Sequence, residues 1–148
     1  SSSAATIPVT LRTVNQDLGV NQNVASFVVP VGATINMDGT AIMQGLATVF
    51  IAQMSGIDLT LFQYVQVVLL AVATSIGTAA VPSAGTITLI IILQQFNLPL
   101  EAIGIILAVD RVLDMLRTSV NVTGDAAIAC IVAKTENQLD ENIFNSKA

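Results

Sequence analysis

The sequence predicts an all-α membrane protein in which transmembrane helices are combined with an unwound break and re-entrant helical hairpins. Of the 148 residues, 53% are hydrophobic and only 10% are charged, and the mean hydropathy is +0.78. A soluble domain usually carries about a quarter charged residues, so this chain lacks the charge to cover a water-facing surface. Short polar runs also interrupt its apolar segments. In lipid, such unwound backbone must be satisfied by neighbouring protein or a lined cavity.

Composition disfavours several classes of function. The net charge of −5 comes from 10 acidic and only 5 basic residues. Nucleic-acid binding is therefore not expected, because phosphate contacts need clustered Lys and Arg. There is no His, and the single cysteine, Cys130, lies inside an apolar run. Without an activated nucleophile or a cluster of metal ligands, an enzyme is the least expected class, and no cofactor is expected.

The first segment, residues 1–14, begins with a serine cluster at residues 1–3. As a helix rising about 1.5 Å per residue, it is too short to cross a bilayer core of about 30 Å. The polar residues 15–23 that follow predict a loop. The abrupt serine start without an initiator Met leads us to expect a portion of a longer protein.

Residues 24–55 predict a transmembrane helix that is apolar at both ends and interrupted at residues 36–40. A soluble helix could absorb this Asn-Met-Asp-Gly-Thr run as a cap and a turn. In lipid, the unwound backbone needs a protein-lined cavity instead. We therefore expect a functional break.

Residues 59–97 predict a re-entrant hairpin. Two apolar helices, at residues 59–75 and 86–96, flank a run of small residues that contains Pro82. Each half is too short or too marginal to span a membrane alone. The tip between them is therefore expected at membrane depth and covered by protein.

Pro99 is a favourable first-turn residue and predicts the start of a second transmembrane helix over residues 99–133. Beyond it, residues 134–148 are polar and mixed in charge. They predict a water-exposed tail, which we expect on the cytoplasmic side of a membrane.

The clearest functional signal is a polar face on this last predicted helix. At about 100° per residue, six polar side chains fall within an arc of roughly 100°. They are Asp110, Asp114, Arg117, Thr118, Asn121 and Asp125. Each charge at the centre of a membrane helix costs about 2.5–3.5 kcal/mol. Charges kept at that cost pair with one another or line the path of an ion or substrate.

The residue types suggest how this face binds a zwitterionic acid. Arg117 can hold a carboxylate through a bidentate fork, which Lys cannot match. Asp114 can accept hydrogen bonds from a substrate ammonium group. Asp110 has no direct role in this scheme and is expected to be an electrostatic neighbour of Arg117.

A second set of side chains suits a small cation. Asn121 and Asp125 offer hard oxygen ligands, and the break supplies matching oxygens from Asn36 and Asp38, together with carbonyl groups freed by unwinding. Interrupted hydrophobic segments that occur in sets indicate a transporter binding site. A purely structural membrane bundle and an anion-conducting channel stay open as alternatives.

Four motifs resemble the dicarboxylate/amino acid:cation symporters, which include the glutamate transporters and their archaeal aspartate-transporting relatives. In chain order, they are Ser1-Ser2-Ser3 with Thr6-Ile7-Pro8, Asn36-Met37-Asp38-Gly39-Thr40, Gly77-Thr78-Ala79-Ala80-Val81-Pro82 with Gly85-Thr86, and the run 110–125. The resemblance covers nearly the whole chain. It implies that the segments are the second arm of hairpin 1, helix 7, hairpin 2 and helix 8.

The resemblance also implies a site for an acidic amino acid and sites for sodium, the coupling ion. The substrate residues are Ser2, Thr40, Val81, Gly85, Asp114, Arg117, Thr118 and Asn121. Gly32, Asn36, Asn121 and Asp125 match one sodium site. Thr34, Ser75, Ile76 and Thr78 match a second. Asn36 and Asp38 match part of a third, and Met37 lies among these sites.

Gln44 stands where the proton- and potassium-coupled animal members have a glutamate, which favours sodium-only coupling. The mechanism implied by the resemblance is an elevator, in which a transport domain slides against a trimeric scaffold that is absent from this chain. The implied partners are membrane lipids and two further copies of the full-length protein, in a plasma or inner membrane that it crosses several times. A proton-coupled glutamate symporter or a C4-dicarboxylate symporter is the alternative, although Asp114 argues against a substrate without an ammonium group.

Overall fold

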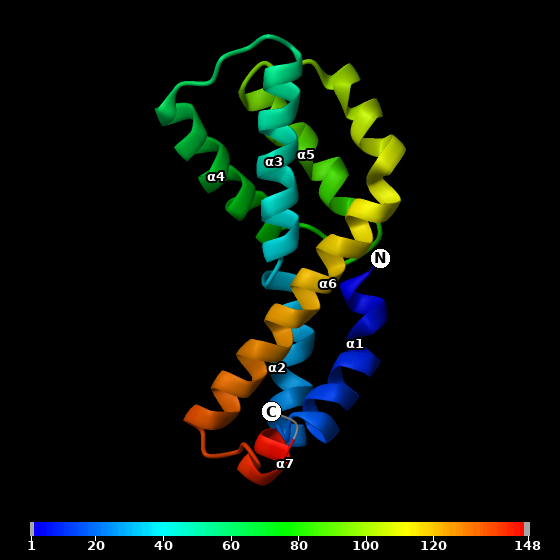
Figure 1. Cartoon of the computed structure of the whole chain (residues 1–148), viewed down its shortest axis with the longest axis vertical. Helices are drawn as coiled ribbons and strands as arrows, with labels where there is room; N and C mark the ends of the chain where they lie inside the picture. Colours follow the sequence, from blue (N-terminus) through cyan, green and yellow to red (C-terminus); the bar gives the residue numbers. More distant parts are fainter. Residues whose placement is uncertain (1, 147–148) are drawn as a thin grey trace.

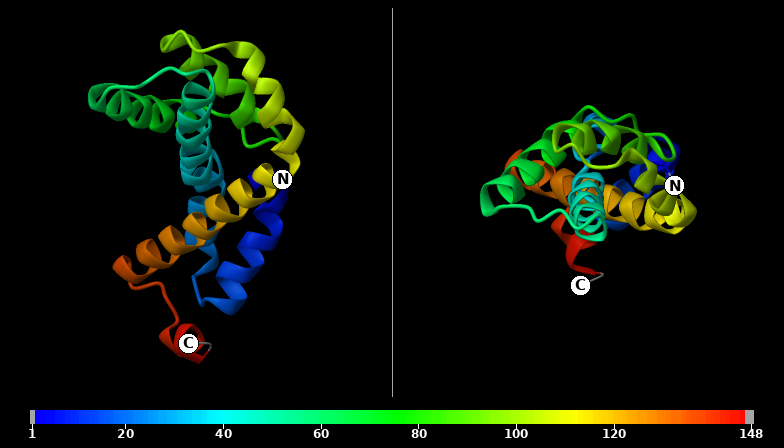
Figure 2. Two further views of the ribbon diagram at one scale, coloured as in Figure 1. Left: turned by 45° about the horizontal axis from the view of Figure 1, so that its top comes forward. Right: turned by 90° about the horizontal axis from the view of Figure 1, so that it is seen from above.

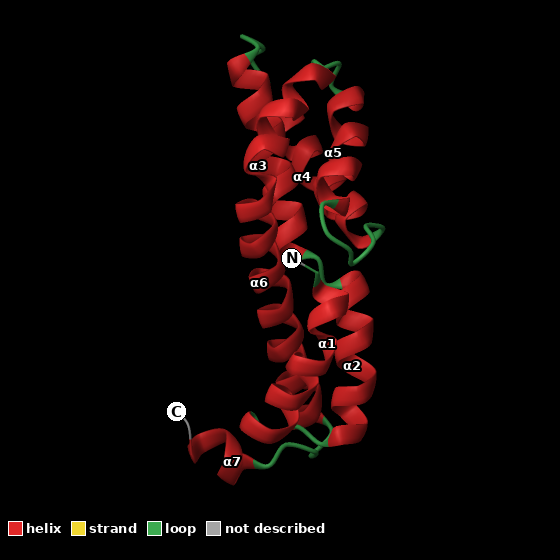
Figure 3. Cartoon of the chain, turned by 90° about the vertical axis from the view of Figure 1, so that its right-hand side faces the viewer, coloured by secondary structure: helices red, strands yellow, loops and turns green. Residues whose placement is uncertain are grey.

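The computed structural model describes residues 2–146, and all the regular elements within that range are helices (Figure 3). The prediction of an all-α chain is confirmed. Ser1 of the predicted serine cluster and residues 147–148 of the predicted tail lie outside the described residues. Within residues 2–146, no helix combines the length and the unbroken apolar character needed to cross a membrane.

The first helix, α1 (Ser3–Arg12), is capped by Ser2, whose hydroxyl accepts a hydrogen bond from the Ala5 backbone N–H at 3.1 Å. A π-helical turn (Thr13–Asp17) continues it directly. The prediction of a loop at residues 15–23 is therefore wrong over much of its length.

A side-chain hydrogen bond explains why this polar stretch stays ordered. Asn15 Nδ2 donates to the Val20 carbonyl at 2.9 Å, which closes the connection after the π-helical turn. The next helix, α2 (Gln22–Ile35), begins behind the Asn21 cap. The polar residues thus stabilise a compact turn, which a prediction from polarity alone does not anticipate.

The break in the second segment is shorter than predicted. α2 ends at Ile35, and α3 (Asp38–Met54) begins after only two residues, Asn36 and Met37. Two backbone N–H groups of the new helix, those of residues 40 and 41, donate to the Met37 carbonyl at 3.0 Å each. An acidic Asp38 in the first turn also favours a helix start at this point.

The third segment forms a helical hairpin. Its arms are α4 (Leu61–Ile76), which starts in a capping box of Thr60 and Gln63, and α5 (Ala84–Gln95). The arms are shifted by one or two residues from the predicted ranges. Ser83 precedes α5 in the left-handed region at φ 60°, so the loop between the arms turns sharply there.

The last long helix is α6 (Ile103–Thr135), which follows a 3-10 turn at Leu100–Ala102. It starts later than the predicted residue 99, because Pro99 caps the 3-10 turn and lies outside the helix. It also extends beyond the predicted end at residue 133.

The predicted tail is partly structured. It contains a short helix, α7 (Glu141–Ser146), whose side chains are exposed or only partly buried. Backbone hydrogen bonds tie the start of the tail to the turn before α2, from Asn21 N to Gln138 O at 3.0 Å and from Asp140 N to Gly19 O at 2.8 Å.

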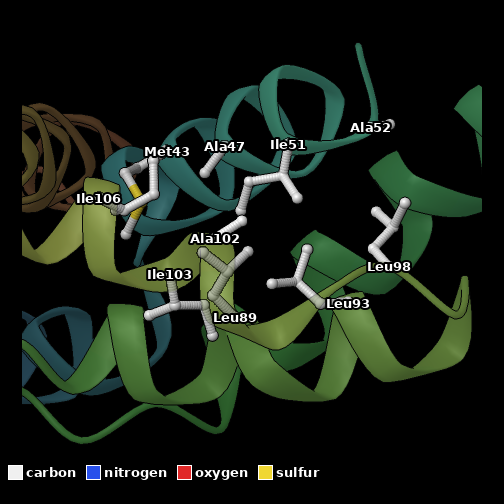
Figure 4. Packing of buried hydrophobic residues seen from close by; sticks show 10 residues of the cluster. All are labelled: Met43, Ala47, Ile51, Ala52, Leu89, Leu93, Leu98, Ala102, Ile103 and Ile106. Atoms are coloured by element: carbon white, nitrogen blue, oxygen red, sulfur yellow. The ribbon is translucent and has the colours of Figure 1, made fainter. Parts of the chain in front are cut away.

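Two apolar cores lie at opposite ends of the molecule, and α6 runs through both (Figures 1 and 2). α3 and α5 pack around its first half, and α4 packs against α3 and α5, while α1 and α2 pack around its second half. In the upper core, side chains from α3, α5 and the start of α6 point toward one another (Figure 4). This core is formed by Met43, Ala47, Ile51, Ala52, Leu89, Leu93, Leu98, Ala102, Ile103 and Ile106. The lower core is formed by Val14, Val20, Ala25, Val28, Val29, Ala129 and Ala133. The break between α2 and α3 lies between the two cores.

Glycines let the break pack closely on α6. A Cβ atom at Gly39 would overlap the backbone carbonyl of Arg117, and one at Gly124 would overlap the side-chain amide of Asn36. A Cβ at Gly32 would lie 2.5 Å from Asp125 Oδ1. These three positions hold backbone and functional groups closer than any larger residue permits.

Gly39→Ala should destabilise the intact protein by about 1–3 kcal/mol, because the obstructing Arg117 carbonyl is backbone and cannot swing aside. Gly45→Ala, on the same helix with no atom within 4 Å of its new Cβ, is the matched control and should be neutral or stabilising by about 0.5–1 kcal/mol. Thermal unfolding of both variants checks this. Equal midpoints would contradict the close approach at Gly39.

Candidate functional site

The six side chains of the predicted polar face of α6 are all buried. Each of the six is at most 7% exposed: Asp110, Asp114, Arg117, Thr118, Asn121 and Asp125. They lie against the break between α2 and α3 and against the start of α5. A buried polar stripe of this length must be satisfied by partners or serve a ligand.

Arg117 and Asp114 form a buried ion pair one turn apart on α6, between Nη2 and Oδ1. The other terminal nitrogen, Arg117 Nη1, is buried and has no hydrogen-bond partner among the described residues. Leaving a buried donor unpaired is costly, and for a charged group it is more so. Arg117 Nη1 is therefore available as a donor, which suits an anionic ligand.

Arg117 lines a small cavity of about 10 Å³, and its Nη1 lies close to Gly85 in the same lining. All eight residues that the resemblance implies for a substrate line it: Ser2, Thr40, Val81, Gly85, Asp114, Arg117, Thr118 and Asn121. Val81 lies in the loop before α5 and is 54% exposed, whereas the cavity residues on α3 and α6 are buried. The structure thus brings these residues together, and none of the eight is remote from the cavity.

Two helix N-termini converge on this cavity. Ser2 caps α1, and Met37 precedes the first turn of α3. The N-terminal end of a helix carries a partial positive charge and unpaired N–H groups, so it favours anions. Together with Arg117, the two ends make this cavity suitable for a carboxylate.

The tip of the hairpin closes the cavity against α1. Ser2 Oγ donates to the Ala80 carbonyl at 2.7 Å, and the Ala4 backbone N–H donates to the same oxygen at 3.3 Å. The first turn of α1 and the tip before α5 are distant in sequence, and these bonds make them one wall.

One predicted group of cation ligands is gathered next to the cavity. Asn36 Nδ2 donates to Asp125 Oδ1 at 3.0 Å and lies 3.4 Å from the Asn121 carbonyl. Gly32 approaches the same carboxylate, and Asp38, whose side chain is exposed, lies near Gly124 beside Asn36. The oxygens gathered here are the Asp125 and Asp38 carboxylates and the Asn121 carbonyl, which suit a hard cation, while Asn36 presents its Nδ2 donor to two of them. Among residues 2–146, no three His, Cys, Asp or Glu side chains gather as a transition metal would require.

Asn121 and Met37 join the cavity to this oxygen cluster. Asn121 Oδ1 accepts from the Gly39 N–H at 2.8 Å, and its Nδ2 donates to the Met37 sulfur at 3.3 Å. Met37 also accepts from Thr40 Oγ1 at 3.7 Å. A shift of the break would therefore move groups at both sites.

The second predicted group of cation ligands does not meet through side chains. The hydroxyls of Thr34 and Ser75 donate to carbonyls of their own helices, at 3.1 and 2.9 Å, and that of Thr78 donates to the Thr74 carbonyl of the preceding helix at 2.8 Å. The Ile76 side chain is 48% exposed. The residues instead mark the C-terminal ends of α2 and α4, which contact each other. Helix C-termini present unpaired carbonyls and a partial negative charge, so the backbone is what could hold a cation there.

Asp110 has hydrogen-bond partners that the sequence does not predict. It accepts hydrogen bonds from Ser83 Oγ at 2.5 Å and from Thr86 Oγ1 at 2.6 Å, at the start of α5. Its role as an electrostatic neighbour of Arg117 stays a prediction beside these contacts. The signal was present as hydroxyl residues inside an apolar hairpin, which bond across helices when no water is available.

Gln44 is a further residue whose contacts were not predicted. It is completely buried, and Nε2 donates to Thr88 Oγ1 at 2.6 Å and to the Gly85 carbonyl at 3.1 Å. Its Oε1 accepts from Thr74 Oγ1 at 2.9 Å. Gln44 therefore connects α3 to both arms of the hairpin and uses both ends of its amide.

Comparison with known proteins agrees with these motifs. The family model described as Sodium:dicarboxylate symporter family matches residues 1–135. The chain is 50% identical over 132 residues to an excitatory amino acid transporter of Caenorhabditis elegans and 52% identical over 132 residues to human excitatory amino acid transporter 2, covering 89% of this chain in both cases. Mouse excitatory amino acid transporter 3 is 51% identical over 148 residues, or 99% of this chain. The chain spans about a quarter of the length of these relatives, at 26%, 23% and 28%.

Gln44→Glu should make stability depend on pH. A glutamate must be protonated to donate to the Gly85 carbonyl, and burial also favours its neutral form. The variant should be nearly as stable as wild type at pH 5 and lose at least about 2 kcal/mol relative to it as the pH rises to 9.

The measurement is thermal unfolding of the intact protein at both pH values. Gln53→Glu, at an exposed position of the same helix, should follow the wild type at both. A Gln44→Glu variant whose midpoint also tracks wild type would argue against a donor role for the Gln44 amide.

Proposed function

The chain belongs to the sodium:dicarboxylate symporter family, and from this premise we propose that the intact protein carries an acidic amino acid, glutamate or aspartate, across a membrane together with sodium. A chain of this family is a transporter and not an enzyme. The single observation that carries the choice of substrate is the free, buried Nη1 of Arg117 beside the Asp114 carboxylate.

These two groups complement the two ends of an acidic amino acid. The guanidinium of Arg117 binds the side-chain carboxylate, with Thr40 beside it. Asp114 accepts hydrogen bonds from the ammonium group, assisted by Thr118 and Asn121. A substrate bound in this way replaces the intramolecular ion pair with two new ones, so little charge is left unpaired. The N-termini of α1 and α3 favour the carboxylates further.

Sodium is the proposed coupling ion. Gly32, Asn36, Asn121 and Asp125 form the first proposed site, and Asn36, Met37 and Asp38 contribute to another. The carbonyls at the ends of α2 and α4, at Thr34, Ser75, Ile76 and Thr78, form the remaining one. Asn121 touches both the oxygen cluster and the cavity, which supports a mechanism in which ion binding orders the substrate site.

The proposed mechanism is an elevator in a plasma membrane. The segments would be the second arm of hairpin 1 (residues 1–14), helix 7 (24–55), hairpin 2 (59–97), helix 8 (99–133) and a cytoplasmic tail (134–148). Together they would slide as one body against a trimeric scaffold and the surrounding lipid. The part of the family's length that this chain does not span would supply that scaffold.

Two alternatives belong to the same family. A proton-coupled glutamate symporter is disfavoured because Gln44, a group that does not titrate, occupies a buried position bonded to the hairpin. A C4-dicarboxylate symporter is disfavoured because Asp114 would face a substrate without an ammonium group.

Arg117→Cys tests the assignment of the carboxylate. In the intact protein reconstituted in liposomes with a sodium gradient, this variant should lose affinity for aspartate by about 10- to 100-fold, because charged hydrogen bonds of about 1.5–3 kcal/mol are removed. It should gain uptake of small neutral amino acids such as serine. Arg111→Cys, an exposed arginine on the same helix, is the matched control and should retain the aspartate affinity. Unchanged aspartate affinity in Arg117→Cys would remove Arg117 from its proposed role.

A further inference from the structure

The wall of the cavity at Gly85 is anchored from α3. The Gly85 carbonyl accepts from Gln44 Nε2 at 3.1 Å and from Thr88 Oγ1 at 3.2 Å. Gln44 cannot easily turn away, because it is fully buried and its other end is bonded to Thr74. The backbone at Gly85 is therefore held toward α3.

The same turn of α5 is anchored from α6 as well. Ser83 and Thr86, on either side of Gly85, both donate to Asp110, which is 5% exposed. A shift of Gly85 would break hydrogen bonds to two helices at once. Each buried group left unsatisfied in this way would destabilise the shifted position.

The loop just before this turn is attached more weakly. Within the described residues, residues 79–82 are joined to other elements by hydrogen bonds to two carbonyls: that of Ala80, from Ser2 and Ala4, and that of Val81, from the Ala84 N–H at a long 3.4 Å. A cavity of about 10 Å³ has to enlarge before it can hold an amino acid. Enlargement is therefore expected at residues 79–82, while the wall at Gly85 stays in place.

The fixed wall stands at the carboxylate-binding end of the cavity. A Cβ atom at Gly85 would lie 2.6 Å from Arg117 Nη1 and 2.9 Å from Thr40 Cγ2. Nη1 is the same buried nitrogen that lacks a partner. Only a glycine leaves room between this wall and Arg117 Nη1.

Resting on the proposed function, we propose that Gly85 determines how long an acidic side chain the site accepts, and that Gln44 is the positioning residue that holds this limit. The missing Cβ leaves the space in which the carboxylate of the longer substrate, glutamate, reaches Arg117. Opening of the tip at residues 79–82 does not extend this space, because the Gly85 wall is tied to α3 and α6.

The test uses substrates that differ by single methylene groups: aspartate with one, glutamate with two and 2-aminoadipate with three. Sodium-driven uptake by the intact protein in liposomes gives the KM for aspartate and glutamate and the inhibition constant for 2-aminoadipate. Gly85→Ala should raise the ratio of glutamate KM to aspartate KM by about 10-fold or more, as one methylene group is worth 10–200-fold in a close-fitting pocket. Gly77→Ala, in the same hairpin with only the Thr74 carbonyl 3.8 Å from its Cβ, should leave the ratio unchanged.

Removing the hydrogen bond from Gln44 to the Gly85 carbonyl should have the opposite effect, because it should let the site accept longer substrates. Gln44→Met keeps an unbranched side chain but cannot donate to Gly85, so it should strengthen inhibition by 2-aminoadipate relative to aspartate by about 10-fold. Thr48→Val is its control, because this equally buried hydroxyl bonds only to the Gln44 carbonyl of its own helix. A purely structural role of Gly85 or Gln44 would change all substrates equally.

The outcomes separate this inference from the function on which it rests. If Gly85→Ala transports aspartate with an unchanged ratio, the inference is overturned and the transporter assignment stands. If Gly85→Ala is inactive, an unchanged 2-aminoadipate preference in Gln44→Met overturns it in the same way. If the wild-type protein shows no saturable uptake of aspartate or glutamate, the proposed function is overturned as well.

Discussion

The buried ion pair of Arg117 and Asp114 constrains which groups can pack around the middle of α6. Two charges at the middle of α6 are removed from solvent, and the cost of their desolvation is recovered only if the surrounding groups satisfy them. Several of the other helices begin or end beside this ion pair, so that helix ends, freed carbonyls and amides surround it. The two apolar cores at either end of α6 then hold these ends in place.

Close contact at the level of this pair depends on residues without side chains. Gly39 allows α3 to begin directly on the Arg117 carbonyl, and Gly124 makes room for the Asn36 amide. Because Asn121 bonds to Gly39 and Met37 together, the groups suited to the substrate and those suited to sodium share one short piece of backbone. Coupling between ion and substrate then needs no long-range pathway, since both would act on the same break.

Periodicity was enough to place the charged face of α6, because helical geometry fixes which side chains share a side. The approximate positions of the two breaks likewise followed from polar and small residues inside apolar runs. What the sequence could not provide was the partner of each group across helices. The hydrogen-bond partners of Asp110, Ser83 and Thr86, are not predictable in this way because they lie 27 and 24 residues away and depend on how the hairpin folds back. The hydrogen bonds of Gln44 to the two arms of the hairpin are not predictable for the same reason.

The proposed function requires that the polar residues around Arg117 and Asp114 recognise both charged ends of an acidic amino acid when sodium is present. The most direct measurement is uptake of labelled aspartate by the intact protein in liposomes, with and without an inward sodium gradient, in competition with succinate. We expect concentrative uptake only with the gradient, and at least about 10-fold weaker competition by succinate, because succinate has no ammonium group for Asp114. Sodium-independent uptake, or succinate competing as well as unlabelled aspartate, would contradict it.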